Sequence, residues 1–175
     1  MARPHDLLIT CAASILLVAC ANPNVSLPVP LAPILEQADA SDSGGVRAAL
    51  VATGLQEESA SRPFPSPYDP AAIDSIRTLR YEGLAVELYW VGTSGQELVQ
   101  SISVTGDRFD TGLGLGVGAS RQLVLDVLGE PGRVERGVWS WDFYQGLDDP
   151  IPTALTLRFD DAGRVTEIRW EYYLG

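Results

Sequence analysis

The sequence predicts an α+β protein built from two tandem units, each a helix followed by a three-stranded antiparallel sheet. Runs in which apolar and polar residues alternate, separated by turns containing glycine, indicate antiparallel strands. A short amphipathic helix pattern precedes the strands in each half of the 175-residue chain. We therefore expect the first unit over residues 46–110 and the second over residues 111–175.

The first unit is predicted to open with a helix that begins at residue 46 and stops near Gly54. A proline-rich loop is expected next, over 63–70. The strands are predicted at three apolar runs, 76–83, 84–91 and 97–105. The turn 92-GTSG-95 joins the last two of these strands.

The second unit repeats the order. Ser120 is a suitable N-cap for a helix over 121–129, and Pro131 prevents the helix from continuing. Its strands are predicted at 133–146, 154–159 and 164–173. Alternation along these strands places Leu155, Leu157 and Phe159 on one side, and Ile168, Trp170 and Tyr172 on one side. The aromatic side chains expected to pack in the core are Trp139, Trp141, Phe143 and Trp170.

Two pairs of similar short segments favour a true repeat. The tetrapeptide 81-YEGL-84 resembles 144-YQGL-147, and 50-LVATG-54 resembles 125-LDVLG-129. The two pairs have different spacings, so the repeat would be divergent and gapped. Chance similarity is the alternative.

The glycine-rich stretch 112-GLGLGVG-118 invites a nucleotide-binding interpretation, which its residues exclude. A P-loop needs a lysine, and the chain has none. A dinucleotide fingerprint needs a third glycine where Val117 stands. We expect instead a flexible join between the two units that permits positive φ and close approach of the helix to the sheet.

The N-terminus has the features of a targeting segment. An apolar run over 7–20 has signal-peptide length and ends in 17-LVAC-20, which resembles the lipobox of bacterial lipoproteins. The resemblance implies cleavage before Cys20, with palmitate-type acyl chains on that residue. It therefore divides the start of the chain into a signal peptide (1–19) and a proline-rich tether (20–45). Ala21, in place of Asp, implies sorting to the outer membrane.

Two alternatives accompany this division. The apolar run would also suit an ordinary secretory signal or a short buried helix. The apolar residues of the tether could instead pack on the folded body or on a partner.

The composition of the chain argues against several classes of function. The net charge is −11 and all twelve basic residues are arginines, so no basic face for nucleic acid is expected. His5, Cys11 and Cys20 are the only residues of their types. A mature chain would therefore lack a Ser-His-Asp triad and a His- or Cys-based zinc site. No cofactor and no metal is predicted, and the acid pairs 148–149 and 160–161 are expected to serve turns.

The second unit as a whole resembles the SmpA/OmlA group of outer-membrane lipoproteins, and its fold resembles that of the β-lactamase inhibitor protein, which has two tandem copies. The matching positions are turn and core residues. They are Gly116, Gly118, Ser120, Val124, Leu128, Gly129, Pro131, Trp139, Phe159, Gly163, Val165 and Ile168. The resemblance implies a non-catalytic protein-binding module that assists outer-membrane assembly. It covers about 65 residues and transfers no partner-binding residue.

We therefore expect a lipoprotein anchored to the outer membrane through Cys20 and facing the periplasm, with a protein partner in the cell envelope. The residues predicted to bind that partner are Tyr89, Tyr144, Tyr172 and Tyr173. A tyrosine-bearing, acidic sheet face would suit a partner with a basic patch. The alternatives are a periplasmic inhibitor of a soluble enzyme and, from another class, a hydrolase that uses two carboxylates across a cleft.

Overall fold

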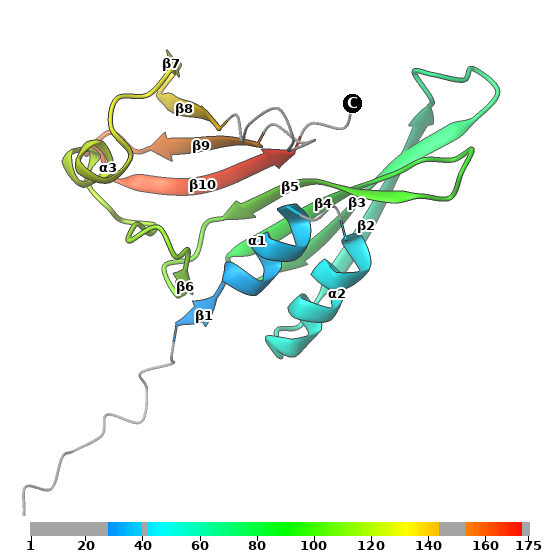
Figure 1. Ribbon diagram of the computed structural model, residues 1–175, viewed down its shortest axis with the longest axis horizontal. Coiled ribbons are helices and arrows are strands. Elements are labelled where there is room, and N and C mark those ends of the chain that lie inside the picture. The colour runs from blue at the N-terminus through cyan, green and yellow to red at the C-terminus, as the bar shows by residue number, and fades with distance from the viewer. Residues whose placement is uncertain (1–27, 40–41, 144–152, 173–175) are drawn as a thin grey trace, which may run out of the picture.

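Ten strands and three helices form the described part of the chain in a computed structural model, which covers residues 28–39, 42–143 and 153–172 (Figure 1). In chain order they are β1 Val29–Pro30, α1 Ala32–Asp39, α2 Ser43–Ala52, β2 Glu58–Pro65, β3 Ile73–Tyr81, β4 Leu84–Trp90, β5 Glu97–Val104, β6 Phe109–Asp110, α3 Arg121–Leu128, β7 Arg133–Glu135, β8 Val138–Phe143, β9 Thr153–Phe159 and β10 Val165–Tyr172.

A single eight-stranded sheet organises the fold, with strand order β2-β3-β4-β5-β10-β9-β8-β7. Every neighbouring pair in this sheet is antiparallel. The mixed helix-and-sheet class predicted from the sequence is confirmed. Each half of the sheet is a meander of four consecutive strands, where the sequence predicted three, and the two meanders meet where β5 pairs with β10.

Strand β2 is the additional strand of the first half and lies partly in the stretch predicted as a proline-rich loop. It pairs along its whole length with β3, from Glu58 opposite Arg80 to Pro65 opposite Ile73. A strand that contains proline is tolerated at the edge of a sheet, because the missing N–H group can point away from the only neighbour. Pro63 and Pro65 lie two residues apart, so both nitrogens face the same, unpaired side.

Strand β7 is the additional strand of the second half. The single strand predicted over residues 133–146 is instead a hairpin, in which Arg136 and Gly137 form a two-residue turn between β7 and β8. Both turn residues have positive φ, 49° and 81°. A two-residue turn of this kind matches the twist of antiparallel strands and closes the hairpin.

Residues 29–39 fall in the stretch predicted as a tether, but they belong to the folded body. β1 pairs in parallel with β6, and α1 follows directly. Leu31, Ile34 and Ala38 are buried in the core. Ile34 and Ala38 lie one turn apart on one side of α1, and Leu31 directly precedes the helix, which explains why this segment packs instead of spanning solvent. The tether prediction therefore does not hold for this part of residues 20–45.

The core lies between the helices and one face of the sheet, and Figure 1 shows α1 and α2 lying against β3, β4 and β5. Two rows of directly paired, buried residues cross the β5–β10 junction, Val104–Ile168–Leu157 and Ile102–Trp170–Leu155. Val46 and Leu50 of α2 and Val124 of α3 are also buried. Burial of each large aliphatic side chain stabilises the fold by about 1.5–3 kcal/mol.

An ion cluster holds α2 against the sheet. The carboxylate of Glu97 at the start of β5 accepts hydrogen bonds from Arg47 Nε at 2.9 Å and Nη2 at 3.0 Å, and from Arg77 Nη1 at 3.2 Å. Burial raises the pKa of Glu97, but the hydrogen bonds and charges of the two arginines outweigh burial and lower it. The bidentate pair links α2 to the start of β5.

The glycine-rich stretch, predicted as the join between the two units, is tied to β10 at its end. Gly118 N donates to Val165 O at 2.7 Å, and Val165 N donates to Ala119 O at 2.9 Å. A Cβ placed at the glycines 112, 114, 116 or 118 would meet no atom within 4 Å, so close approach is not the reason for them. Gly118, with φ of 89°, allows the chain to turn into α3.

The prediction that Ser120 caps α3 is confirmed. Its side chain accepts a hydrogen bond from Leu123 N at 3.2 Å.

Asp74 joins the far ends of two hairpins. Its side chain is 1% exposed and accepts hydrogen bonds from the Tyr89 hydroxyl and, at 2.8 Å, from Gly92 N. Hydrogen bonds from Tyr89, Gly92 and Ser66 together lower the pKa of Asp74 against the opposing effect of burial. The carboxylate thereby connects the β2–β3 turn, through Ser66, to the β4–β5 turn.

Replacing Asp74 by Asn should destabilise the protein in a pH-dependent way. Because the folded pKa of Asp74 lies below its unfolded value of about 3.9, the charged group stabilises the fold above about pH 4. That contribution is lost as the pH falls through the folded pKa. Urea unfolding at pH 7, 4 and 3 should show a gap between the parent protein and Asp74→Asn that narrows in acid. A gap that stays constant or widens would contradict this role.

Candidate functional site

The tyrosines predicted to bind a partner do not form one surface among the described residues. Tyr172 is 5% exposed and lies with Ile168 and Trp170 on the helix side of β10. Tyr89 lies on the opposite face, half-buried, with its hydroxyl donating to Asp74. Burial, together with that hydrogen bond, raises the pKa of Tyr89 to about 12. Tyr144, Tyr173 and the predicted lipidation site Cys20 lie outside the described residues.

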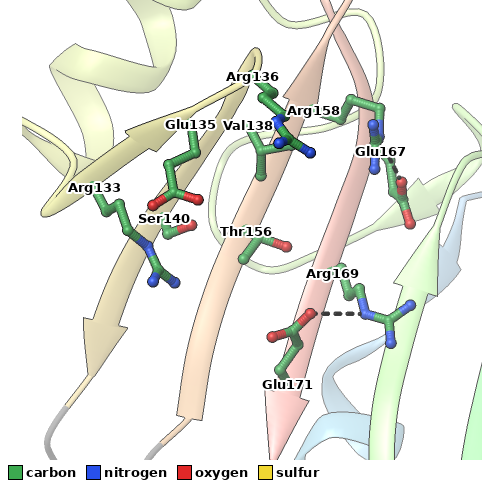
Figure 2. Close-up of a pocket in the computed structure, with 10 residues that line it drawn as sticks. All are labelled: Arg133, Glu135, Arg136, Val138, Ser140, Thr156, Arg158, Glu167, Arg169 and Glu171. Carbon is green, nitrogen blue, oxygen red and sulfur yellow. Dashed lines mark hydrogen bonds and ion pairs between the residues drawn. The ribbon is translucent and has the colours of Figure 1, made fainter.

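A hollow of about 840 Å³ lies on the sheet face opposite the core, over β7 to β10 (Figure 2). We call it the arginine hollow. It is lined by four arginines, three glutamates, two hydroxyl residues and one valine. These are Arg133, Arg136, Arg158, Arg169, Glu135, Glu167, Glu171, Ser140, Thr156 and Val138.

Strand alternation places these side chains together. Ser140 of β8 pairs with Thr156 of β9, which pairs in turn with Arg169 of β10. Directly opposed residues in an antiparallel pair point to the same face of the sheet. The residues between them along each strand, such as Leu155, Leu157 and Ile168, point to the helices and are buried. The hollow is therefore formed by the polar side chains of the same strands whose apolar side chains form the core.

Two of the four arginines are engaged by acidic residues. Arg169 Nη2 lies 2.9 Å from Glu87 Oε2, and its Nε lies 3.1 Å from Glu171 Oε1. Glu87 also accepts a hydrogen bond from the Ser101 hydroxyl at 2.9 Å. Arg158 Nε lies 3.2 Å from Glu167 Oε2. Because Arg158 is largely exposed, this last pair contributes at most about 1 kcal/mol.

Arg133 and Arg136 are not engaged. Within the described ranges, neither guanidinium has a carboxylate oxygen within 4.0 Å, and neither donates a side-chain hydrogen bond. Glu135, which stands between them in the chain, is also without an ion pair in this part of the structure. Together with Glu135, these two arginines leave a small excess of positive charge at this edge of the sheet, in a protein of net charge −11.

The backbone of Arg136 adopts an unusual conformation. It is the one residue other than glycine, within the segments described, that has a positive φ. The left-handed region disfavours a side chain such as arginine by roughly 1–2 kcal/mol, and Asn or Gly is the usual choice at this place in a two-residue hairpin turn. Local strain of this kind is found preferentially at functional positions.

The arrangement suits recognition of charged groups. A guanidinium binds a carboxylate through two parallel hydrogen bonds. Small-molecule pockets are mostly apolar, whereas this lining is mostly charged. Glu167 and Glu171 are four residues apart on one strand, which separates their Cα atoms by about 13 Å, and each lies beside an arginine. Each of these two carboxylates is therefore already paired with an arginine of the chain.

The structure bears on two further expectations about the site. The acidic sheet face predicted from composition does not describe the hollow, where arginines outnumber glutamates. Asp160 serves its turn as predicted, since it accepts a hydrogen bond from Arg164 N at 2.8 Å. The pair 148–149 lies outside the described residues. Among the residues described, no three His, Cys, Asp or Glu side chains gather as a metal site would require.

Comparison of the chain with protein-family models, with curated proteins and with solved structures found no match. In the ranges that the structure describes, none of the helices has the length and apolar character needed to cross a bilayer.

Sequence reasoning did not single out the arginine hollow. The signal that was present is the arginine or hydroxyl residue at alternate positions of strands whose other positions are aromatic or aliphatic. Ser140 between Trp139 and Trp141 is an example, and so is Arg169 between Ile168 and Trp170. Such a polar stripe predicts an uncovered face, but the strands that share it are known only once their order is known.

Replacing Arg136 by Asn should stabilise the fold by about 0.5–1 kcal/mol, because Asn tolerates positive φ and Asn-Gly is the preferred two-residue turn. The free energy of unfolding, measured by urea denaturation, tests this. The matched variant Arg133→Gln, on the adjacent exposed strand, should stay within about 0.5 kcal/mol of the parent protein. A loss of stability in Arg136→Asn would show that the arginine side chain supports the turn.

Proposed function

We propose that this chain is a lipid-anchored, non-catalytic protein-binding module of the outer membrane, facing the periplasm and acting in membrane assembly. The observation that carries the proposal is the asymmetry of the sheet. The described helices lie on one face, and the other face is open and contains the arginine hollow. A broad, charged, uncovered surface suits docking of a folded partner.

The composition of the open face supports a protein partner. Arginine is enriched in protein interfaces, and charges of both signs select a partner and orient it. At the other end of the same face, the ring centroids of Phe64 and Tyr89 are 5.9 Å apart. Half-buried aromatic side chains of this kind are frequent anchors at interfaces.

The anchor is supported by the sequence around Cys20. Eight residues lie between Cys20 and Val29, where β1 begins, so a fully extended connection could span at most roughly 30 Å. Because β1 and α1 belong to the folded body, the tether in this proposal is shorter than residues 20–45. The body, and with it the open face, would stay close to the membrane surface.

We also propose that the two halves are divergent copies of one unit, as in the β-lactamase inhibitor protein. The strand order supports this, since β2-β3-β4-β5 is mirrored by β10-β9-β8-β7. α2 and α3 each precede one meander, and each is followed by a glycine with positive φ, Gly54 and Gly129. The unit would then be one helix and four strands.

A periplasmic enzyme inhibitor would use the same open face, and a carboxylate-dependent hydrolase is the less favoured alternative. The identity of the partner distinguishes an assembly factor from an enzyme inhibitor. An assembly factor should be bound to membrane-embedded proteins, and an inhibitor to a soluble enzyme.

A photo-crosslinking amino acid placed at Thr156, which lines the arginine hollow on β9, should yield adducts of higher mass in intact cell envelopes. The same amino acid at Val51, 74% exposed on α2, should yield none, because α2 lies on the helix side. Gel mobility and mass spectrometry of the adducts provide the readout. Adducts from Val51 alone, or from neither position, would contradict the proposed surface.

Replacing Cys20 by Ser should abolish both incorporation of labelled palmitate and sedimentation with membranes, because each buried methylene contributes roughly 0.8 kcal/mol to membrane binding. Replacing Cys11 by Ser is the matched control and should change neither. A Cys20→Ser protein that remained labelled and membrane-bound would disprove the anchor.

A further inference from the structure

We propose that the arginine hollow is a carboxylate-binding site, in which Arg133 and Arg136 take acidic side chains from an extended segment of the protein partner. This inference rests on the proposed function, and it names the chemistry of the partner at that surface. The occupant is a polypeptide segment that carries carboxylates.

The first support is the availability of the two guanidinium groups. Arg169 is held by Glu87 and Glu171, and Arg158 by Glu167, so these two arginines already have their carboxylates. Arg133 and Arg136 have none within 4.0 Å among the described residues. A carboxylate from outside would supply the bidentate partner that Arg158 and Arg169 find within the chain.

The second support is the placement of these groups. Arg133 begins β7 and Arg136 follows its end, so the two arginines border the hollow at opposite ends of a three-residue strand. Figure 2 shows the hydroxyls of Ser140 and Thr156 lying between β7 and the Arg169–Glu171 pair of β10. Hydroxyl groups at that place can donate to a bound carboxylate or to a backbone carbonyl of the same segment.

The third support is the presence of both arginines and glutamates in the hollow, which favours an acidic polypeptide over other anionic ligands. Three glutamates line the same hollow, and the whole chain carries −11. Nucleic acid, polyphosphate or a surface of anionic lipid would bring closely spaced negative charges against those glutamates. An extended polypeptide presents alternate side chains to one face. It can place a carboxylate at each free arginine and a neutral or basic group beside Glu135.

The test uses the full-length protein in detergent micelles with two capped peptides as probes. One is a threonine nonamer with Glu at positions 3 and 7, so that a neutral side chain lies between the two carboxylates on the same face, and the other has Gln in place of both Glu. Calorimetry and the NMR signals of the arginine Nε–H groups report binding. We expect the Glu peptide to bind and to shift the signals of Arg133 and Arg136, and the Gln peptide to do neither.

Charge-removing variants make the test specific. The double variant Arg133→Gln/Arg136→Asn should weaken binding of the Glu peptide by about tenfold or more, as expected when charge-assisted hydrogen bonds are lost. Arg62→Gln is the matched control and should bind as the parent protein does. Arg62 is exposed on β2, at the opposite edge of the same sheet, and makes no ion pair among the described residues. Thermal unfolding of each variant verifies that it is folded.

Three results would overturn the carboxylate site. They are equal binding of the Glu and Gln peptides, an equal loss in Arg62→Gln, and displacement of the Glu peptide by millimolar inorganic phosphate or by anionic vesicles.

Failure of this inference is distinguishable from failure of the proposed function. Crosslinking from Thr156 that persists in the double variant, with no peptide binding, would remove the carboxylate site and leave the docking surface. Peptide binding with no adduct from Thr156 would leave the carboxylate site and remove the proposed docking surface.

Discussion

The pairing of β5 with β10 is the interaction on which the rest of the structure depends. It joins two four-stranded meanders through four opposed residue pairs, from Ile168–Val104 to Glu171–Ser101. The apolar members continue the core from one half to the other. The polar members continue the uncovered face, where Arg169 of β10 reaches Glu87 of β4. Without this seam, each half would be a four-stranded sheet with one or two short helices and little buried surface.

Local patterns predicted much of this fold, because they are sufficient where one face of a strand is apolar. The alternation of Ile168, Trp170 and Tyr172 predicted a strand that is present, with all three residues buried. The cap at Ser120 was predicted because its chemistry involves only neighbouring residues. Strand β2 was missed because its tolerance of proline depends on being at an edge, which is a property of the assembled sheet.

The candidate site was less accessible to sequence reasoning, for a related reason. Its side chains come from alternate positions of four strands, which share one face only once the register of the sheet is known, and none belongs to a recognisable motif. Tyrosines were predicted as contacts from their residue type alone, yet Tyr172 points to the helices because of its parity along β10. The hairpin at Arg136 was missed because Arg-Gly is a weak turn signal, although Gly137 was visible in the sequence.

The prolines of β2 have a consequence for how molecules of this protein behave at high local concentration. An unprotected edge strand offers a row of N–H and C=O groups that a neighbouring chain can extend into a shared sheet. Pro63 and Pro65 remove two donors from one end, and at the other end β7 is three residues long with a charge on either side of Val134. Fibre-like polymerisation is therefore discouraged at both ends, and association has to proceed through side chains.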